Sequence, residues 1–258
     1  MKAEKATGTK ILFVGESWIK HTIHMKGFDH FISVEYGEGA DVFLKCLAKD
    51  GFDVTYVRSH EVSEKFPTSL EELQQYDAVA LSDIGSNSFL LGNETFLKSK
   101  IMANRLQLIV DFVRRGGGLV KIGGYMSFSG IDGRARYGMT PLASILPVEM
   151  LSHDDRIEVP EGMEPEVVAA GHAATGDIPS KWPALLGYNK TTAKAGSTVI
   201  ARIGGDPLLV VNQEGKGRVL AFMSDVAPHW APPEFVGWPH YGALWTSMVG
   251  WAANRAKH

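Results

Sequence analysis

Short apolar runs alternate with amphipathic segments through the first half of the chain. Apolar residues at helical spacing predict helices at 38–51 and 102–118, and three glycines close the second helix. Ser69 and Glu72 have the spacing of a capping box, which predicts a short helix. Between Trp18 and the first helix we expect a long loop. The apolar runs themselves predict buried strands at residues 11–14, 52–57, 76–83 and 119–124.

Strands that alternate with helices build βαβ units, so this half predicts a parallel sheet with helices on both faces. Residues 197–225 contain three short strands separated by Gly-Gly-Asp-Pro and Glu-Gly-Lys-Gly, which are typical hairpin turns. We expect them to extend the same sheet as an antiparallel C-terminal part. Residues 240–256 predict a closing helix, and residues 150–195 predict loops with short strands. The expected fold is therefore α/β, as one domain over residues 1–258.

Composition and charge narrow the class of protein. The 258 residues are 45% hydrophobic and carry a net charge of −3 without a basic cluster, which argues against a nucleic-acid partner. The N-terminus has no apolar leader, and no apolar run approaches the ~18 residues of a membrane span, so we expect a cytoplasmic protein without a membrane partner. The single cysteine, Cys46, excludes an intrachain disulfide and a cysteine-based zinc cluster.

The predicted parallel sheet suggests where a ligand binds, because α/β sheets bind ligands beyond the carboxyl ends of their strands. Four predicted strands end in polar or aromatic residues, which would meet in one crevice. These residues are Glu16, Ser17 and Trp18; Asp83, Ser86 and Asn87; Gly124, Tyr125, Met126 and Ser127; and Asp225, His229 and Trp230.

Several motifs along the chain resemble the class I glutamine amidotransferase-like superfamily, in the branch that includes trehalose-utilisation-like proteins. They are FVGESW, HMKGFDHF, LSDIGSN, GGGLVKIGGYMSFSG and GKGRVLAFMSDVAPHW, in this order over nearly the whole chain. The resemblance implies a flavodoxin-like core with added antiparallel strands. It also implies a cysteine nucleophile on the turn after a central strand, assisted by a histidine that follows a later strand.

The family's cysteine position falls here at about Tyr125 or Met126, and neither side chain can attack an amide. Cys46 cannot replace it, because its spacing places it on the buried face of the first helix. His229 stands where the resemblance places the family's histidine. We therefore expect a protein without glutaminase activity.

Three residues are candidates for other chemistry. Glu16 and His229 are proposed as an acid–base pair, with the alternative that Glu16 caps a loop or pairs with Lys26. Ser127 is a candidate nucleophile, but Tyr and Ser at positions 125 and 129 break the Gly-x-Ser-x-Gly pattern. The favoured alternative is that Ser127 hydrogen-bonds the backbone of its own turn, whose free amides would then bind an anion.

The expected ligand is a small polar metabolite. Asp83 either acts on the substrate or begins an Asx-turn, and Asn87 is preferred as the ligand contact. Trp230 either stacks on the ligand or packs against the last helix. The full set of expected binding residues is Ser17, Trp18, Lys26, Asn87, Gly124, Tyr125 and Trp230.

His21, His24 and His30 lie close together in sequence but match no metal-ligand pattern, so neither a metal nor another cofactor is expected.

Two functions remain open from the sequence. The first is an enzyme that hydrolyses or isomerises a small polar metabolite without a cysteine nucleophile. The second is a non-catalytic binding or scaffold protein with a degenerate amidotransferase site. An accessory subunit of a synthetase ranks last, because the family's nucleophilic cysteine and a fused synthetase segment are both missing. Homo-oligomerisation is expected through the tryptophan-rich segment 231–245.

Overall fold

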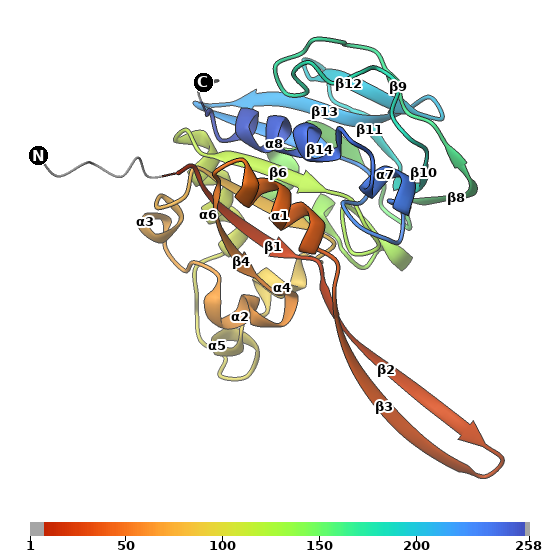
Figure 1. Cartoon of the computed structure of the whole chain (residues 1–258). Helices are drawn as coiled ribbons and strands as arrows, with labels where there is room; N and C mark the ends of the chain where they lie inside the picture. Colours follow the sequence, from red (N-terminus) through yellow and green to blue (C-terminus); the bar gives the residue numbers. More distant parts are fainter. Residues whose placement is uncertain (1–7, 256–258) are drawn as a thin grey trace, which may run out of the picture.

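The computed structural model describes residues 8–255, and its centre is an eight-stranded sheet (Figure 1). Five neighbouring strands, from β4 to β14, run parallel, and the last three are antiparallel. The predicted parallel sheet with an antiparallel C-terminal extension is confirmed. In spatial order the strands are β4 (Asp53–Val57), β1 (Lys10–Gly15), β5 (Ala78–Ser82), β6 (Gly118–Ile122), β14 (Gly217–Phe222), β13 (Asp206–Glu214), β12 (Thr198–Ile203) and β9 (Glu166–Val167).

Helices cover both faces of the sheet because its central strands are apolar on both sides. In β1, Ile11 and Phe13 pack into the cluster under α1 and α8, whereas Leu12 and Val14 pack into the cluster under α6. Burial on both faces explains why this strand is a continuous apolar run. The helices are α1 (Asp41–Lys49), α2 (Val62–Lys65), α3 (Leu70–Leu73), α4 (Asn87–Leu90), α5 (Asn93–Phe96), α6 (Arg105–Arg114), α7 (Pro233–Val236) and α8 (Tyr241–Ala252).

Helix ends follow the predicted signals. Asn104 caps α6 by accepting hydrogen bonds from the amides of Leu106 and Gln107. Ser69 caps α3 by accepting from the amide of Glu72, while the Glu72 carboxylate accepts from the amide of Thr68. The capping residues therefore fix where both helices begin.

Residues 131–193 form short elements, and all except β9 lie beside the main sheet. The expectation of loops with short strands, made for residues 150–195, agrees with the short strands found there. Two small antiparallel sheets pair β10 with β8 and β11 with β7. The elements are the 3-10 helices η2 (Ile131–Gly133), η3 (Tyr137–Met139) and η4 (Pro141–Ser144), and the strands β7 (Val148–Met150), β8 (Arg156–Met163), β10 (Leu185–Asn189) and β11 (Thr191–Ala193).

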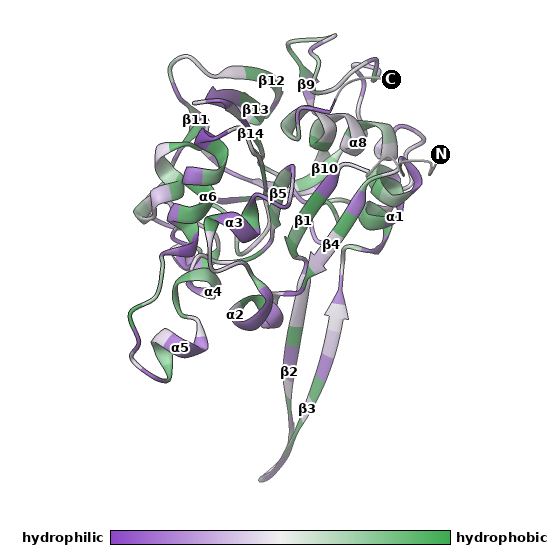
Figure 2. Cartoon of the chain, turned by 90° about the vertical axis from the view of Figure 1, so that its left-hand side faces the viewer, coloured by the Kyte–Doolittle hydropathy of each residue, from purple (hydrophilic) through white to green (hydrophobic). Residues whose placement is uncertain are grey.

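The prediction of a long loop after Trp18 is wrong. Residues 17–38 form a hairpin of β2 (Ser17–Lys26) and β3 (Asp29–Glu38), which we call the arm. The arm extends away from the body of the molecule in both orientations (Figures 1 and 2). Its two-residue turn begins with Gly27 at φ +64°, the conformation required at the first position of a type II′ turn.

Within residues 8–255, no helix is both long and apolar enough to cross a membrane.

The tryptophan-rich segment 231–245 does not form the exposed surface that was expected. Phe235, Tyr241 and Trp245 are buried in the core under α8, and Trp238 is half-buried against it. These aromatic residues pack the closing helix onto the sheet.

Candidate functional site

Three carboxyl groups meet at the carboxyl ends of parallel strands. Glu16 follows β1, Asp83 follows β5 and Asp225 follows β14. Glu16 and Asp225 are almost fully buried, and Asp83 is half-buried. Glu16 and Asp83 also have left-handed backbone conformations, with φ of 48° and 38°. Strained non-glycine residues of this kind are concentrated at functional sites, so the backbone marks the same place as the charges.

Glu16 and Asp225 are neighbouring buried carboxyl groups that influence each other's ionisation. The hydroxyl of Ser82 donates to Glu16 Oε1 at 2.5 Å, and the amides of Val226 and Ala227 donate to Asp225 Oδ1. Burial, with the nearby charge of Asp83, raises the pKa of Glu16 to about 8. Burial and the Glu16 charge raise the pKa of Asp225 well above its usual range. Two carboxyls in such contact cannot easily both ionise, so the pair retains a proton near neutral pH.

Asp83 is the most accessible of the three carboxyls. Its Oδ1 accepts a hydrogen bond of 2.6 Å from the amide of Met126, which holds it at the edge of the turn after β6. Burial raises its pKa, and the Met126 amide and the charges of His229 and Lys121 oppose this increase.

Lys121 supplies a buried cation beneath these carboxyls. Its ammonium donates to Ser127 Oγ at 2.5 Å and to the carbonyl of Ile122 at 3.2 Å, and it lies 4.5 Å from the ring centre of Tyr137. Burial lowers its pKa to about 7, against the opposing attraction of Asp83, Asp155 and Glu16. A lone lysine inside the apolar run LVKI was the sequence signal for this residue, and our sequence analysis did not use it.

The turn after β6 is closed by its own hydrogen bonds. Ser127 is fully buried and donates to the carbonyl of Ile122 at 2.5 Å, so its hydroxyl bonds the turn's backbone, as the favoured alternative predicted. The amides of Gly124, Met126 and Ser127 donate to Asn189 Oδ1, Asp83 Oδ1 and the carbonyl of Gly124, respectively. The prediction that these amides are free to bind an anion is therefore wrong.

Asp155 and Asn189 brace this turn from outside it. The Asp155 carboxylate accepts hydrogen bonds of 2.8 Å from the amides of Ser129 and Gly130, and one of 2.9 Å from Asn189 Nδ2. Asn189 also donates to the carbonyl of Gly124. Both residues lie in the aperiodic segment, so no sequence pattern pointed to them.

Three aromatic side chains lie next to one another at the same end of the sheet. The rings of Tyr125 and His229 stack with centres 5.0 Å apart, and Trp18 lies 6.0 Å from His229. His229 is exposed, and Trp18 is 37% exposed at the base of the arm. Glu16 and His229, predicted as an acid–base pair, lie at the same end of the sheet, with Glu16 buried and His229 exposed.

Trp230 does not belong to this aromatic group at the surface. It is buried, donates from Nε1 to Glu158 at 3.0 Å, and contacts the ring edge of Tyr125. A β-carbon at Gly187 would lie 2.3 Å from its Nε1, so the indole requires a glycine there. Trp230 therefore packs against β8 and β10, and not against the last helix as the packing alternative expected.

Three other expected binding residues lie elsewhere. Lys26 is at the tip of the arm, opposite Asp29, and does not reach Glu16 at the base of the arm. Ser17 is buried and accepts from the amide of Ser59. Asn87 is exposed at the start of α4. Of the two residues considered after β5, it is Asp83 that lies near Glu16 and Asp225.

The histidines of the arm do not converge. His21 and His24 are an odd number of residues apart in one strand, so their side chains point to opposite faces. Within the described residues, no group of three or more His, Cys, Asp or Glu side chains has an arrangement that could hold a metal ion.

Cys46 lies away from the strand ends, in α1. It is only half-buried, not buried as expected, and packs beside Gly242 of α8. Burial raises the pKa of its thiol, so it lacks the features of an activated nucleophile.

A family model described as "Putative glutamine amidotransferase" matches residues 10–254. The chain belongs to this GATase1-like family. No curated protein matches the sequence. The GATase1-like assignment explains the sheet order and the site at the strand ends, and the resemblance found from the sequence motifs is confirmed.

Solved structures include close relatives of this GATase1-like chain. The cytoplasmic protein STM1381 from Salmonella typhimurium LT2 is 50% identical, with a TM-score of 0.92 over 95% of this chain and 99% of that one. The cytoplasmic protein STM3548 from Salmonella typhimurium is 46% identical, with a TM-score of 0.91 over 94% and 98% of the two chains. A ThuA-like protein from Parabacteroides merdae, 13% identical with a TM-score of 0.58 over 95% and 90%, shares the fold.

Proposed function

We propose that this GATase1-like protein is an acid–base enzyme that acts on a small, neutral, polar metabolite at the carboxyl ends of its strands. The observation that carries the proposal is the buried Glu16–Asp225 pair beside Asp83, in which two of the three carboxyls sit on strained backbone. Structural carboxylates are normally ion-paired or exposed. Here burial raises all three pKa values, which is typical of groups that exchange protons with a substrate.

The carboxyl cluster can both donate and accept a proton near neutral pH. Because Glu16 and Asp225 hold a proton between them, one oxygen is a donor while the half-buried Asp83 is available as a base. Lys121 stabilises the negative charge that remains after a proton is donated. Moving a proton between neighbouring atoms of a substrate, which is an isomerisation, needs no more than these groups.

Covalent catalysis has less support. The position of the family's cysteine holds Tyr125 or Met126, and Ser127 is buried with its hydroxyl bonded to Ile122. A hydrolysis would therefore proceed by general-base activation of water rather than through an acyl-enzyme.

We infer the ligand class from the carboxyl groups and the aromatic rings at the strand ends. Three carboxyl groups disfavour an anionic ligand and offer hydrogen-bond partners to hydroxyl, amide or amine groups. The rings of Trp18, Tyr125 and His229 offer flat apolar surfaces beside them. A polyol, a monosaccharide or a small amide matches both features. The two Salmonella relatives are titled cytoplasmic proteins, and we propose the same location for this chain.

The test is a thermal-shift screen of neutral monosaccharides, polyols and small amides, followed by NMR of each hit in D2O. We expect a hit to stabilise the wild type and to exchange a carbon-bound proton for deuterium, or to be converted. Glu16→Gln and Asp83→Asn should lose this conversion, and Asp111→Asn, which changes a half-buried carboxylate of α6, should keep it.

Conversion that survives in both site variants would overturn the acid–base assignment. A ligand that binds at this site without exchange or conversion would instead support the alternative function, a non-catalytic binding protein. The stacking of the Tyr125 ring on His229 is the observation that favours this alternative.

A further inference from the structure

The arm has one apolar face and one polar face. In an antiparallel pair, directly opposite residues share a face. The pairs Ile19–Tyr36, Ile23–Ile32 and Met25–His30 therefore lie on one side of the arm, together with His21–Val34. The apolar residues of this side are between 50% and 69% exposed: Ile19, Ile23, Met25, Ile32, Val34 and Tyr36. We call this set the arm face.

The opposite side of the arm is mainly polar. It carries the pairs Lys20–Glu35, Thr22–Ser33 and Lys26–Asp29, and Lys20 forms an exposed ion pair with Glu35 at 3.3 Å. Its large apolar residues are Trp18 at the base and Phe31, whose ring stacks on His24 with centres 4.3 Å apart. This largely alternating pattern is that of an antiparallel sheet with one face on a core and one in water. The arm has the pattern, but within residues 8–255 it has no core beneath it.

Among residues 8–255, the arm meets the body only at its base, where Ser17 accepts from the amide of Ser59 and Tyr36 contacts His60. Beyond the base the two strands pair in unbroken register to Lys26–Asp29, and the tip residue Phe28 is fully exposed. An isolated two-stranded hairpin is only marginally stable in water, so a long, regular one implies a covering partner.

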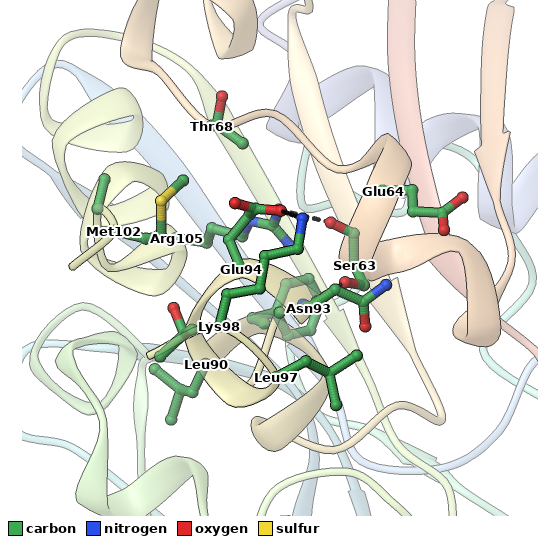
Figure 3. A pocket seen from close by; sticks show the side chains of 14 residues that line it. Ser63, Glu64, Thr68, Leu90, Asn93, Glu94, Leu97, Lys98, Met102 and Arg105 are labelled. Carbon is green, nitrogen blue, oxygen red and sulfur yellow. Dashed lines mark hydrogen bonds and ion pairs between the residues drawn. The ribbon is translucent and has the colours of Figure 1, made fainter. Parts of the chain in front are cut away.

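The body has a second apolar surface at α5. Apart from the arm, most of the exposed large hydrophobic residues of the described chain lie in one short segment: Leu91, Phe96, Leu97, Ile101 and Met102. We call this set the α5 patch. It borders a pocket of about 500 Å³ with a mixed lining, in which Phe89, Leu90, Leu97 and Met102 stand beside polar and charged residues such as Ser63, Asn93 and Arg105 (Figure 3). The Glu94–Lys98 ion pair lies among these side chains.

We propose that the arm face packs against a second copy of this chain, with the tip residue Phe28 at the partner's α5 patch. Both uncovered apolar surfaces occur in every copy, so one two-fold arrangement would cover both arms and both patches. This inference does not depend on the proposed enzymatic function.

The area of the arm is sufficient for a stable contact. At ~200 Å² for a fully exposed large side chain, the arm face and Phe28 together expose on the order of 900 Å². A standard interface buries ~800 Å² on each partner. A monomer seldom exposes a continuous apolar surface larger than ~300–600 Å².

The net charges of the two segments are opposite in sign. Residues 17–38 carry two lysines against three carboxylates, most of them on the polar side of the arm, whereas residues 91–105 carry two lysines and the buried Arg105 against one glutamate. The arm is thus slightly acidic and the α5 segment basic, which favours the approach of two copies rather than the apolar contact itself.

The decisive experiment compares two neighbouring residues on opposite faces of β2. Ile23→Asp places a charge on the arm face, and Thr22→Asp places the same charge on the polar face. By size-exclusion chromatography with light scattering, we expect the wild type and Thr22→Asp to have twice the chain mass or more, and Ile23→Asp to have the mass of one chain. Because the arm lies outside the core, the melting temperature of the body should distinguish loss of assembly from loss of folding.

A wild type with the mass of one chain at every concentration tested would overturn the proposal, as would equal masses for the two variants. The position of the tip is tested by Phe28→Cys with Leu97→Cys in a Cys46→Ser background. The double variant should form disulfide-linked dimers under mild oxidation. Equally efficient cross-linking of the Phe28→Cys single variant would overturn the assignment of the α5 patch.

Discussion

The hydroxyl of Ser82 donates a hydrogen bond of 2.5 Å to Oε1 of Glu16 and so joins the ends of the adjacent strands β1 and β5. Glu16 also lies close enough to Asp225, which follows β14 on the other side of β6, for its charge to raise the pKa of Asp225. One buried carboxyl therefore interacts with groups at two further strand ends. Its protonation state should influence both the chemistry of the site and the stability of the fold.

Glu16→Gln should change how stability depends on pH. The pKa of Glu16 is about 8 in the folded protein and 4.5 in its ordinary environment, so between these values the folded state holds a proton that the unfolded state has lost. Its contribution to stability is complete below pH 4.5 and is lost as the pH rises towards 8. The variant lacks this loss, so its melting temperature relative to the wild type should rise steadily from pH 5 to pH 8.

The pKa shift of Lys121 changes the folding stability in the opposite direction and over a different pH range. Its lowered pKa of about 7 means that stability is regained as the pH rises from 7 towards 10.5. The two windows overlap only near pH 7–8, so the Glu16 effect is cleanest below pH 7. Glu35→Gln, which removes an exposed carboxylate of the arm, is the control and should give a curve parallel to the wild type. A constant difference between Glu16→Gln and the wild type at all pH values would contradict the assignment.

The sequence predicted the layers of the fold because most of the central strands are apolar runs and the long helices have apolar faces. The arm was missed for a physical reason. Its alternation of apolar and polar residues from Trp18 to Tyr36 is a strand pattern, but three histidines and two lysines made it resemble a polar loop. A hairpin that leaves the body also has no core in its own chain to confirm the pattern.

Part of the site was predictable and part was not. The rule that ligands bind at strand ends selected Glu16, Asp83, Asp225 and His229, because the first two follow their strands directly and the last two lie in the segment after β14. The pairing of Glu16 with Asp225 depends on the order of strands in the sheet, which spacing does not reveal. The brace from Asp155 and Asn189 comes from a segment without periodicity, so only the folded chain brings it to the turn.

Asp83→Asn should stabilise the protein and reduce its activity. Burial makes the ionised Asp83 unfavourable, as its raised pKa shows, and asparagine removes that charge. The amide oxygen can still accept from the Met126 amide, and asparagine tolerates the positive φ at this position. We expect a gain of about 1 kcal/mol, or about 2–4 °C in melting temperature for a domain of this size.

The measurement is a thermal melt at neutral pH, combined with the conversion assay on the ligand found by screening. A stabilised variant that loses conversion shows the exchange of stability for function expected at an active site. A variant that is destabilised by a similar amount would show that the Asp83 charge holds the turn in place, and would contradict the prediction.

Asp155→Ala should destabilise the fold much more than Asp154→Ala. Removing the Asp155 side chain leaves two buried amides and the Asn189 side chain without an acceptor, which should cost about 2–4 kcal/mol. Asp154 is the neighbouring residue and forms a partly exposed ion pair with Arg156. Its loss should cost less than about 1 kcal/mol. Urea denaturation curves of the two variants provide the comparison, and equal losses would show that Asp155 does not brace the turn.

Ser127 should be unreactive in the folded protein. Its hydroxyl is fully buried, donates to Ile122 and accepts from Lys121, so its proton is bonded to the backbone and its oxygen is shielded from solvent. A serine-directed fluorophosphonate should therefore add no mass to the wild type. Ser127→Ala should lose about 1–3 kcal/mol of stability, because the Lys121 ammonium loses a buried partner, yet it should keep any conversion shown by the wild type.

Mass spectrometry of the treated protein and a parallel activity assay of the variant test whether Ser127 is a nucleophile. Labelling at Ser127, or loss of conversion in an Ser127→Ala protein that is still folded, would restore the serine as a nucleophile and Lys121, with its lowered pKa, as its base.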